Sequence, residues 1–405
     1  MPSEIDLLRS LDDQPRTPST VDVRRAIAAG RRRRTRRVVG YAGAAAVTAI
    51  ALAGASLAGG LVSGEAAPRT GASGPPVDTV PAGPTPPTSC ELERLPLPDR
   101  EPMALVTGAN PTAEYIVGRT YPRSGGYQAV IWHGGTVKKV MLPGDLEESL
   151  TDVNSTGTAV GWSYSAKGQE PYVYQGGKVS KLPGVERGFA NAISDTGAIV
   201  GVDEEIDAPV LWSSPTAQPK RLPLPAGTPG GSAAAIDEDG TVVGAAGDQA
   251  YVWFADGTHR PLPMPDLDGK PAAMARAASV RDGWVTGVAN NGVGRKGENP
   301  KAEGAQRVVV AAVRWNLRTG AVEVLDGAQN AGNATNAHGW QAGTDGQGHA
   351  VFIAEGKTLV LPAVPGQKLA PLANIATTLS DDGRTIGGQS DDATGTIQAV
   401  VWRCH

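Results

Sequence analysis

Three aspartates are the candidates for a catalytic role in this 405-residue chain. Asp152, Asp237 and Asp381 each lie near the end of a short apolar stretch with the character of a strand. Carboxylates that converge on one opening can act as general acids and bases, for example at a glycosidic or lactone bond. An enzyme acting on a sugar or lactone is therefore the alternative function, and it requires elements that bring these carboxylates together.

Other patterns of reactive residues predict no further site. The five histidines are scattered without the spacing of zinc ligands. Residues 292–297 match GxGxxG, but they lie in a polar insertion and not between a strand and a helix, where that motif binds a pyrophosphate. The acidic turns at 237–240 and 381–383 lack the twelve-residue calcium loop, and Asx turns explain them. The sequence predicts no catalytic residue, no metal and no cofactor.

The longest insertion of the chain's repeated part, residues 289–306, is the candidate binding loop. Loops carry function more often than the strands that hold them, although an ordinary surface insertion is the simpler alternative. The polar residues that would contact a ligand there are Asn290, Asn291, Arg295, Lys296, Glu298 and Lys301.

These residues must be positioned by a repeat that begins near residue 103. Each unit has a short apolar strand, a polar turn that ends in Gly, and a second strand that ends in Gly. Six turn glycines lie four residues before a strand glycine: 157/161, 197/201, 240/244, 283/287, 339/343 and 383/387. The first unit has strand glycine Gly118 but Glu114 in place of the turn glycine, which makes seven units.

A third and a fourth strand complete each unit. The third ends in an aromatic residue, at Trp132, Tyr174, Trp212, Trp253, Trp315, Phe352 and Trp402. The fourth often ends in Leu-Pro, and Pro suits an outer edge strand because its missing N–H is dispensable there. Four strands at a period of about 40 residues are typical of propeller blades. The sequence predicts an all-β, seven-bladed β-propeller of four-stranded blades, with the aromatic residues packed between neighbouring blades.

The ring is expected to close through the two ends of its sequence. The seventh unit ends at His405 without a fourth strand, whereas residues 91–96 resemble an isolated fourth strand. Pairing them removes an open edge that would otherwise invite aggregation. Cys90 and Cys404, the only two cysteines, would then face each other and form a disulfide, two free thiols being the alternative.

The units resemble the bacterial extracellular repeats that are named after a His-Ala-Phe motif. The nearest match is His349-Ala350-Val351-Phe352, and residues 193–197 with 200–201 fit the same pattern. The likeness covers about residues 103–404. It implies a secreted or surface-displayed β-propeller, and it implies no particular activity.

The residues before the repeat predict a membrane anchor. Residues 38–62 contain no charged side chain, and at about 1.5 Å per residue such a helix crosses a hydrocarbon core of about 30 Å. Residues 1–37 hold ten Arg against five Asp or Glu, and basic residues beside a span stay in the cytoplasm. A cleaved signal peptide is the alternative, although its apolar region would be shorter and nearer the start.

The domain boundaries follow from these patterns. Residues 1–37 form a cytoplasmic basic segment, 38–62 a transmembrane helix, 63–89 a Pro/Thr/Gly-rich linker, and 90–405 the extracytoplasmic propeller. The propeller holds 26 Lys or Arg against 34 Asp or Glu, which disfavours nucleic acid as a partner. The sequence therefore predicts a single-pass cell-membrane protein, with its N-terminus inside, that displays a non-enzymatic binding module for an extracellular protein or a cell-envelope glycan.

Overall fold

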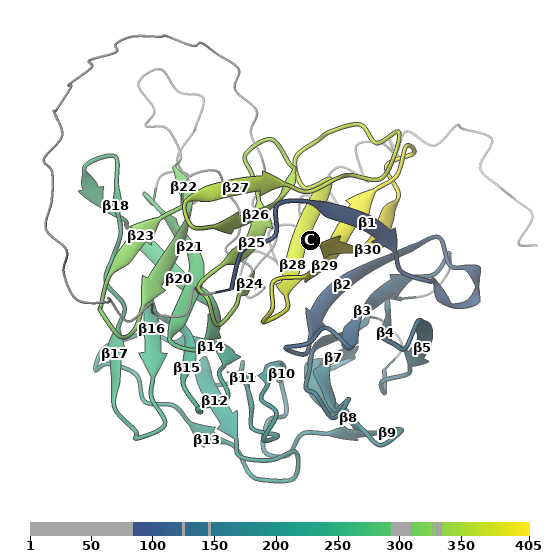
Figure 1. Ribbon diagram of the computed structural model, residues 1–405. Coiled ribbons are helices and arrows are strands. Elements are labelled where there is room, and N and C mark those ends of the chain that lie inside the picture. Colours follow the sequence, from purple (N-terminus) through teal and green to yellow (C-terminus); the bar gives the residue numbers. More distant parts are fainter. Residues whose placement is uncertain (1–83, 124–125, 145–146, 293–308, 326–327, 329–333) are drawn as a thin grey trace, which may run out of the picture. The chain divides into compact units, whose positions relative to one another are not determined.

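The computed structural model describes residues 84–405 except 124–125, 145–146, 293–308, 326–327 and 329–333. The described residues form seven antiparallel four-stranded sheets (Figure 1). The first strand of each sheet contacts the first strand of the next, and the seventh contacts the first. These contacts close a circle of seven blades and confirm the predicted β-propeller. The predicted cytoplasmic segment, transmembrane helix and nearly all of the linker lie outside the described residues.

The strands of each blade are numbered along the chain. Blades 1 and 2 consist of β2 (Met103–Ala109), β3 (Tyr115–Tyr121), β4 (Gln128–His133) and β5 (Thr136–Val140), then β6 (Glu148–Val153), β7 (Ala159–Ser165), β8 (Gly168–Gln175) and β9 (Lys178–Lys181). Blades 3 and 4 consist of β10 (Gly188–Ile193), β11 (Ile199–Asp203), β12 (Ala208–Trp212) and β13 (Lys220–Arg221), then β14 (Gly231–Ile236), β15 (Val242–Ala246), β16 (Gln249–Trp253) and β17 (His259–Pro261).

The remaining blades follow the same order. Blades 5 and 6 consist of β20 (Met274–Arg281), β21 (Trp284–Asn290), β22 (Val310–Asn316) and β23 (Val322–Val324), then β24 (Ala334–Thr335), β25 (Gln341–Thr344), β26 (Ala350–Ala354) and β27 (Lys357–Val360). Blade 7 consists of β28 (Asn374–Leu379), β29 (Thr385–Asp391), β30 (Ile397–Cys404) and β1 (Cys90–Arg94). Two further elements were not predicted: the 3-10 turn η1 (Pro98–Arg100) and a hairpin of β18 (Asp266–Leu267) and β19 (Lys270–Pro271).

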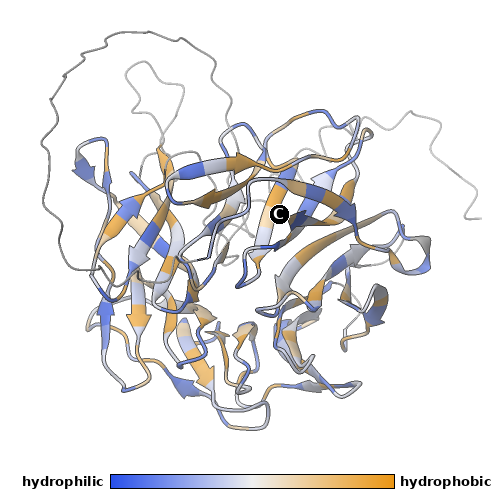
Figure 2. Ribbon diagram, in the orientation of Figure 1, coloured by the Kyte–Doolittle hydropathy of each residue, from blue (hydrophilic) through white to orange (hydrophobic). Residues whose placement is uncertain are grey.

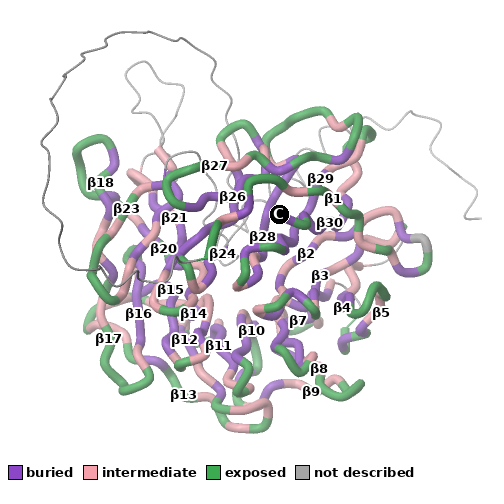
Figure 3. Tube along the Cα trace, viewed as in Figure 1, coloured by how far each residue is buried: buried purple, intermediate pink, exposed green. Residues whose placement is uncertain are grey.

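Burial falls from the inner strands to the outer ones. The first three strands of a blade are mostly buried (Figure 3). In fourth strands such as β9, β13 and β27, at least every second residue is exposed. Apolar residues are concentrated on the sheets and polar residues in the turns (Figure 2). A sheet whose two faces are both apolar must be covered on both sides, and the neighbouring blades provide that cover.

A β-bulge explains why each second strand contains a glycine. In blade 3 the pairing of β10 with β11 shifts between Ala190 and Ala192, and Gly201 lies opposite Ala190. A Cβ on Gly201 would lie 2.0 Å from the carbonyl oxygen of Phe189, which no side chain tolerates. The same clash, at 1.9–2.0 Å, would occur at Gly118, Gly161, Gly244 and Gly287.

The bulge corrects two details of the predicted repeat. In blade 7 the glycine opposite the bulge is Gly388, whose Cβ would lie 2.0 Å from the oxygen of Ile375, and not the predicted Gly387. In blade 1 the role of the missing turn glycine falls to Ala113, at a φ of 54°. Its N–H donates to the carbonyl of Asn110, as that of Gly157 does to Asn154. In blades 1 and 7 the hydrogen-bonded turn between the first and second strands therefore holds one residue more than that of blade 2.

Tryptophans join neighbouring blades at five interfaces. The indole of Trp212, at the end of β12, donates to the carbonyl of Pro183 in blade 2 at 2.8 Å. We call this contact the Trp–Pro hydrogen bond. It recurs from Trp132 to Pro96, Trp253 to Pro223, Trp315 to Pro263 and Trp402 to Pro362, at 2.6–2.8 Å. The predicted packing role of the tryptophans is thereby confirmed.

Phe352 was wrongly assigned to this position in blade 6. Strand register places Ile353 where the other blades have Trp, because Ile353 lies opposite Gln341 as Trp212 lies opposite Ile199. Successive side chains of a strand point to opposite faces, so Phe352 packs instead toward blade 7, with Trp340 and Trp402. The interface between blades 5 and 6 therefore has no Trp–Pro hydrogen bond among the residues described.

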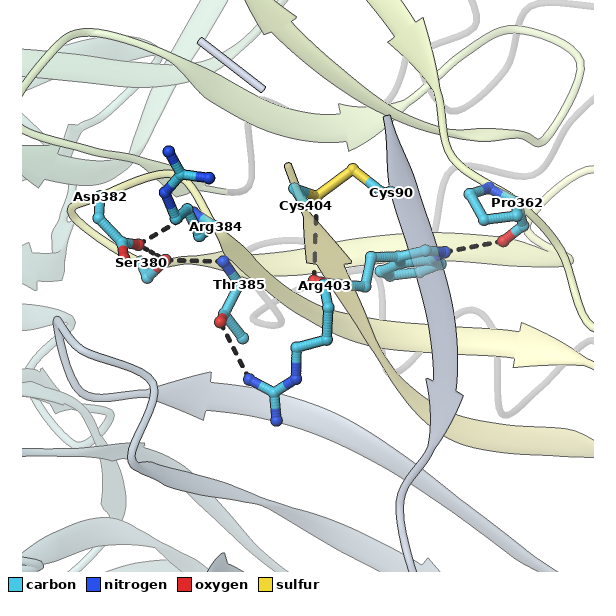
Figure 4. The surroundings of a disulfide bond; sticks show 9 residues. Cys90, Pro362, Ser380, Asp382, Arg384, Thr385, Arg403 and Cys404 are labelled. Atoms are coloured by element: carbon cyan, nitrogen blue, oxygen red, sulfur yellow. Dashed lines mark hydrogen bonds between the residues drawn. A yellow bond between two sulfur atoms is a disulfide. The ribbon is translucent and has the colours of Figure 1, made fainter. Parts of the chain in front are cut away.

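The ring closes as the sequence predicted. Strand β1 pairs antiparallel with β30, with Leu92 opposite Trp402 and Cys90 opposite Cys404. The two sulfurs are bonded, across a sequence separation of 314 residues (Figure 4). Backbone hydrogen bonds between Ser89 and His405 extend the same ladder beyond the strands.

Candidate functional site

The axis of the ring is lined by side chains that tie the blades together. The bulged residue of several first strands donates to the carbonyl of the corresponding strand in the next blade. These hydrogen bonds run from Thr377 to Val106, Thr107 to Leu150, Thr151 to Ala190 and Asn191 to Ala233, at 2.6–3.1 Å. They form a continuous belt from blade 7 through blades 1, 2 and 3 to blade 4. At the next two positions, Ala234 and Ala278 have no side-chain donor.

Asp152, one of the three predicted carboxylates, belongs to this inner wall. It follows the bulge in β6, and its Oδ2 accepts the backbone N–H of Ile193 in blade 3 at 2.9 Å. Burial raises the pKa of Asp152 to about 7, against the opposing effect of that hydrogen bond. The carboxyl group therefore links blades 2 and 3 and titrates near neutral pH.

Asp237 and Asp381 meet at a single arginine. Arg281, the last residue of β20, donates from Nε and Nη2 to the carboxylate of Asp381 at 2.9 and 2.6 Å. Its Nη1 lies 3.2 Å from Glu238 and 3.7 Å from Asp237. The two predicted carboxylates are thus brought together, but around a guanidinium group that neutralises them, and Asp152 does not join them.

The turns after the first strands continue this pattern around one face of the ring. Asp195 accepts the N–H and the hydroxyl of Ser155 from blade 2, and its own N–H donates to Glu238 in blade 4. Asp381 closes the chain of contacts by donating its N–H to the carbonyl of Pro111 in blade 1 at 2.8 Å. Within the turns, Asp239 and Asp382 accept backbone N–H groups two residues on, which are the predicted Asx turns. No cluster of three or more potential metal ligands occurs among the described residues.

The predicted binding loop is only partly within the described residues. Asn290 is the last residue of β21, and its Oδ1 accepts the N–H of Gly292 at 2.9 Å. The Oδ1 of Asn291 accepts the N–H of Val309 at 3.1 Å, which closes the base of the loop. Arg295, Lys296, Glu298 and Lys301 lie outside the described residues, as does most of the GxGxxG match.

A cavity of about 610 Å³ lies beside the base of this loop, between blades 5 and 6. Its apolar wall comes from Val310, Leu325, Ala328 and Val351, and Asp345 lies at its polar side. At this interface Ile353 stands at the position that Trp occupies in five other blades, so its smaller side chain takes the place of a buried indole. The buried contact at this interface consists of aliphatic residues, Ala312, Leu325, Ala328, Val351 and Ile353.

A second surface gathers aromatic residues that take no part in the Trp–Pro hydrogen bonds. It consists of Arg119, Tyr121, Tyr127, Trp162 and Tyr164, which we call the aromatic surface. All five lie where the second strands of blades 1 and 2 end or the third strand of blade 1 begins. The sequence contained the signal: four of them stand one or three residues after the strand glycines Gly118 and Gly161.

The comparisons with known proteins found solved structures of weak similarity and no family. No protein-family model and no curated protein matches this chain. A solved structure described as YCF48 bound to D1 peptide is 14% identical and has a TM-score of 0.45, covering 80% of this chain and 99% of its own. An oligogalacturonate lyase in complex with manganese is 11% identical, with a TM-score of 0.47, covering 80% and 96%. With TM-scores below 0.5, these similarities carry no argument about this chain.

Proposed function

We propose that this protein is a membrane-anchored extracellular binding module, which recognises a protein or a cell-envelope glycan and catalyses no reaction. Residues 38–62 would span the cell membrane once, with basic residues 1–37 in the cytoplasm and the propeller outside. Within the described residues there is no helix that is long and apolar enough to cross a membrane. The anchor, the extracellular location and the kinship with bacterial His-Ala-Phe repeats therefore rest on the sequence.

One observation carries the non-catalytic part of the proposal: two of the three predicted carboxylates, Asp152 and Asp381, form contacts that hold the blades together. Asp381 is fixed by two hydrogen bonds from Arg281, and Asp152 by the N–H of Ile193. Carboxylates that act as general acid and base must be free to exchange protons with a bound substrate. The groups that vary between blades, the aromatic surface and the long loop of blade 5, lie instead at the ends of second and third strands.

The alternative, an enzyme acting on a sugar or lactone at the channel, is favoured by one feature. A buried carboxyl group whose pKa is about 7, such as that of Asp152, is suited to proton transfer at neutral pH. Asp152→Asn removes that capacity and keeps an oxygen for the N–H of Ile193. If the protein has such an activity, this variant loses it, whereas a binding module retains its ligand.

The test uses the full-length protein in detergent micelles with envelope material separated into protein-free glycan and envelope protein. Saturable retention on either fraction, unchanged in Asp152→Asn, supports the proposal. Retention on neither fraction contradicts it, and so does turnover of a sugar or lactone that Asp152→Asn abolishes. Protease added to whole cells tests the location, because an external propeller, but not residues 1–37, is accessible from outside.

A further inference from the structure

The positions one and three residues after the strand glycine differ sharply between blades. The residue just before that glycine packs against the next blade, as Val117 does with blade 2 and Val160 with blade 3. Side chains alternate along a strand, so the two positions that follow face the same way and lie over the same interface. Blades 3 to 7 have Val202/Glu204, Ala245/Gly247, Val288/Asn290, Thr344/Gly346 and Gln389/Asp391 there. Blades 1 and 2 have Arg119/Tyr121 and Trp162/Tyr164.

The aromatic rings of blade 1 are held in fixed positions. The rings of Tyr121 and Tyr127 lie 4.4 Å apart, on either side of the loop that joins β3 to β4. The guanidinium group of Arg119 lies 4.9 Å from the ring centre of Tyr127 and 5.4 Å from that of Tyr121. Its Nε also donates to the hydroxyl of Tyr121 at 3.0 Å. A cation stacked on two rings limits their motion and presents a preformed surface.

The aromatic pair of blade 2 lies over the next interface. Trp162 and Tyr164 meet edge to face, with ring centres 5.7 Å apart. Both side chains are partly exposed. The indole of Trp162 therefore differs from those of the five tryptophans in Trp–Pro hydrogen bonds, which are buried between blades.

The start of β6 connects the two pairs, because the N–H of Glu148 donates to the carbonyl of Tyr127 at 3.1 Å. The backbone carbonyl of Glu147 accepts the N–H of Tyr164 at 2.8 Å. Burial raises the pKa of Tyr121 and of Tyr164, and the nearby carboxylate of Glu147 adds to the increase in both. Glu204, which also raises the pKa of Tyr164, lies 3.9 Å from Arg187. The rings thus lie near the carboxylates of Glu147 and Glu204, and the guanidinium group of Arg119 lies over the rings of blade 1.

This combination suits one class of ligand. A sugar ring has an apolar face of C–H groups, which packs on an aromatic ring, and a rim of hydroxyls, which form charge-assisted hydrogen bonds with carboxylates and guanidinium groups. Rings interrupted by charged groups do not form the continuous apolar core of a protein interface. The acidic propeller disfavours an anionic polymer.

We infer that the aromatic surface binds a neutral oligosaccharide, with one sugar unit on Tyr121 and Tyr127 and another on Trp162 and Tyr164. The inference rests on the proposed binding function and specifies its ligand class and its site. Glu147, between the two pairs, and Arg119 would then supply hydrogen bonds to the hydroxyls of the bound sugar.

The experiment titrates full-length protein with a panel of neutral tetrasaccharides: gluco-, manno-, arabino- and chito-oligosaccharides. Binding is measured by calorimetry and by tryptophan fluorescence. At least one member is expected to bind saturably, and Trp162→Ala is expected to weaken binding at least tenfold. Trp284→Ala is the matched control, because Trp284 is also a partly exposed tryptophan on a second strand, at its other end and in blade 5. It is expected to change binding less than twofold.

Trp162→Phe protects the test against misfolding of the alanine variant. It keeps a smaller ring and is expected to weaken binding by an intermediate factor with an unchanged thermal midpoint. Absence of binding across the panel, or equal binding by wild type and both Trp162 variants, contradicts the inference. Retention on envelope protein without sugar binding removes the glycan ligand but leaves the binding function intact. Preferential binding of a polyuronate, lost in Arg119→Ala, also overturns the neutral-glycan assignment.

Discussion

Arg281 and Asp381, separated by 100 residues, join blade 5 directly to blade 7 by a bidentate ion pair. The arginine also reaches Glu238 in blade 4, so one guanidinium group connects three blades on the face formed by the turns after the first strands. Its side chain is 22% exposed and that of Asp381 is 36% exposed. The pair is therefore less screened by water than an ordinary surface ion pair.

Arg281→Ala is expected to lower the free energy of unfolding by about 1–3 kcal/mol, because it leaves three carboxylates close together without a counter-charge. Arg281→Lys should recover only part of the loss, since an ammonium group cannot form the bidentate pair. Urea denaturation measures both. Arg318→Ala is the control: its pair with Asp282 is more than half exposed on both sides, and its loss should cost under about 0.5 kcal/mol.

The Cys90–Cys404 disulfide should stabilise the propeller mainly by restricting the unfolded chain. Replacing both cysteines by Ser is expected to cost about 2–5 kcal/mol. The wild-type protein in reductant should lose a similar amount, whereas the double variant should not respond to reductant. Equal stability of oxidised and reduced wild type would show that pairing of β1 with β30 closes the ring without the covalent bond.

The Trp–Pro hydrogen bond can be separated from the packing of its ring. Trp402→Phe retains much of the buried surface but removes the N–H that donates to Pro362 at 2.7 Å. The expected loss is about 1–2 kcal/mol, as an unpaired carbonyl and a small void remain. Trp284→Phe should change stability much less, because the ring of Trp284 is partly exposed and stacks on Arg314.

Asp152 predicts a pH dependence of stability with a definite sign. Its pKa is raised in the folded state to about 7, so the folded protein holds this proton more tightly than the unfolded chain. The stabilising contribution of protonated Asp152 is fully present below about pH 4, the pKa of an aspartate in the unfolded chain. It is lost progressively as the pH rises toward 7. Shifts of this size correspond to at most about 4 kcal/mol.

Asp152→Asn tests this dependence, since an amide does not titrate in that range. Chemical denaturation between pH 4 and 8 should show a smaller loss of stability with rising pH in the variant. Glu148, whose pKa burial also raises to about 7, accounts for part of the slope that remains. An unchanged slope in Asp152→Asn would mean that Asp152 is ionised throughout this pH range. The hydrogen bond from the N–H of Ile193 would then stabilise the carboxylate enough to offset the cost of its burial.

The spacing of small and aromatic residues was enough to predict the fold. Glycine opposite a bulge is required in six of the blades, so the repeating units could be counted from the sequence. The isolated strand at residues 91–96 and the incomplete seventh unit together predicted the closure. Both features are local and repeated, and a repeat reveals the same constraint several times.

Details that depend on a single residue's register were less predictable. A shift of one position exchanges the two faces of a strand, which is why Phe352 was mistaken for the counterpart of the tryptophans and Gly387 for that of Gly388. The role of Arg281 could not be foreseen, because its partners come from other blades. The aromatic surface was missed although four of its five residues recur at fixed offsets from Gly118 and Gly161.

The disulfide also determines how the ring responds to mechanical load. The closing strand β1 begins at Cys90, so a pull on the preceding chain reaches it after breaking only the hydrogen bonds that Thr88 and Ser89 form with His405. Without the covalent bond, the pull would act on the terminal hydrogen bonds of β1 and could peel that strand from its neighbour. The bond to Cys404 passes the tension directly into β30, which is paired on both sides. The disulfide therefore keeps the propeller closed when force is applied at its N-terminal end.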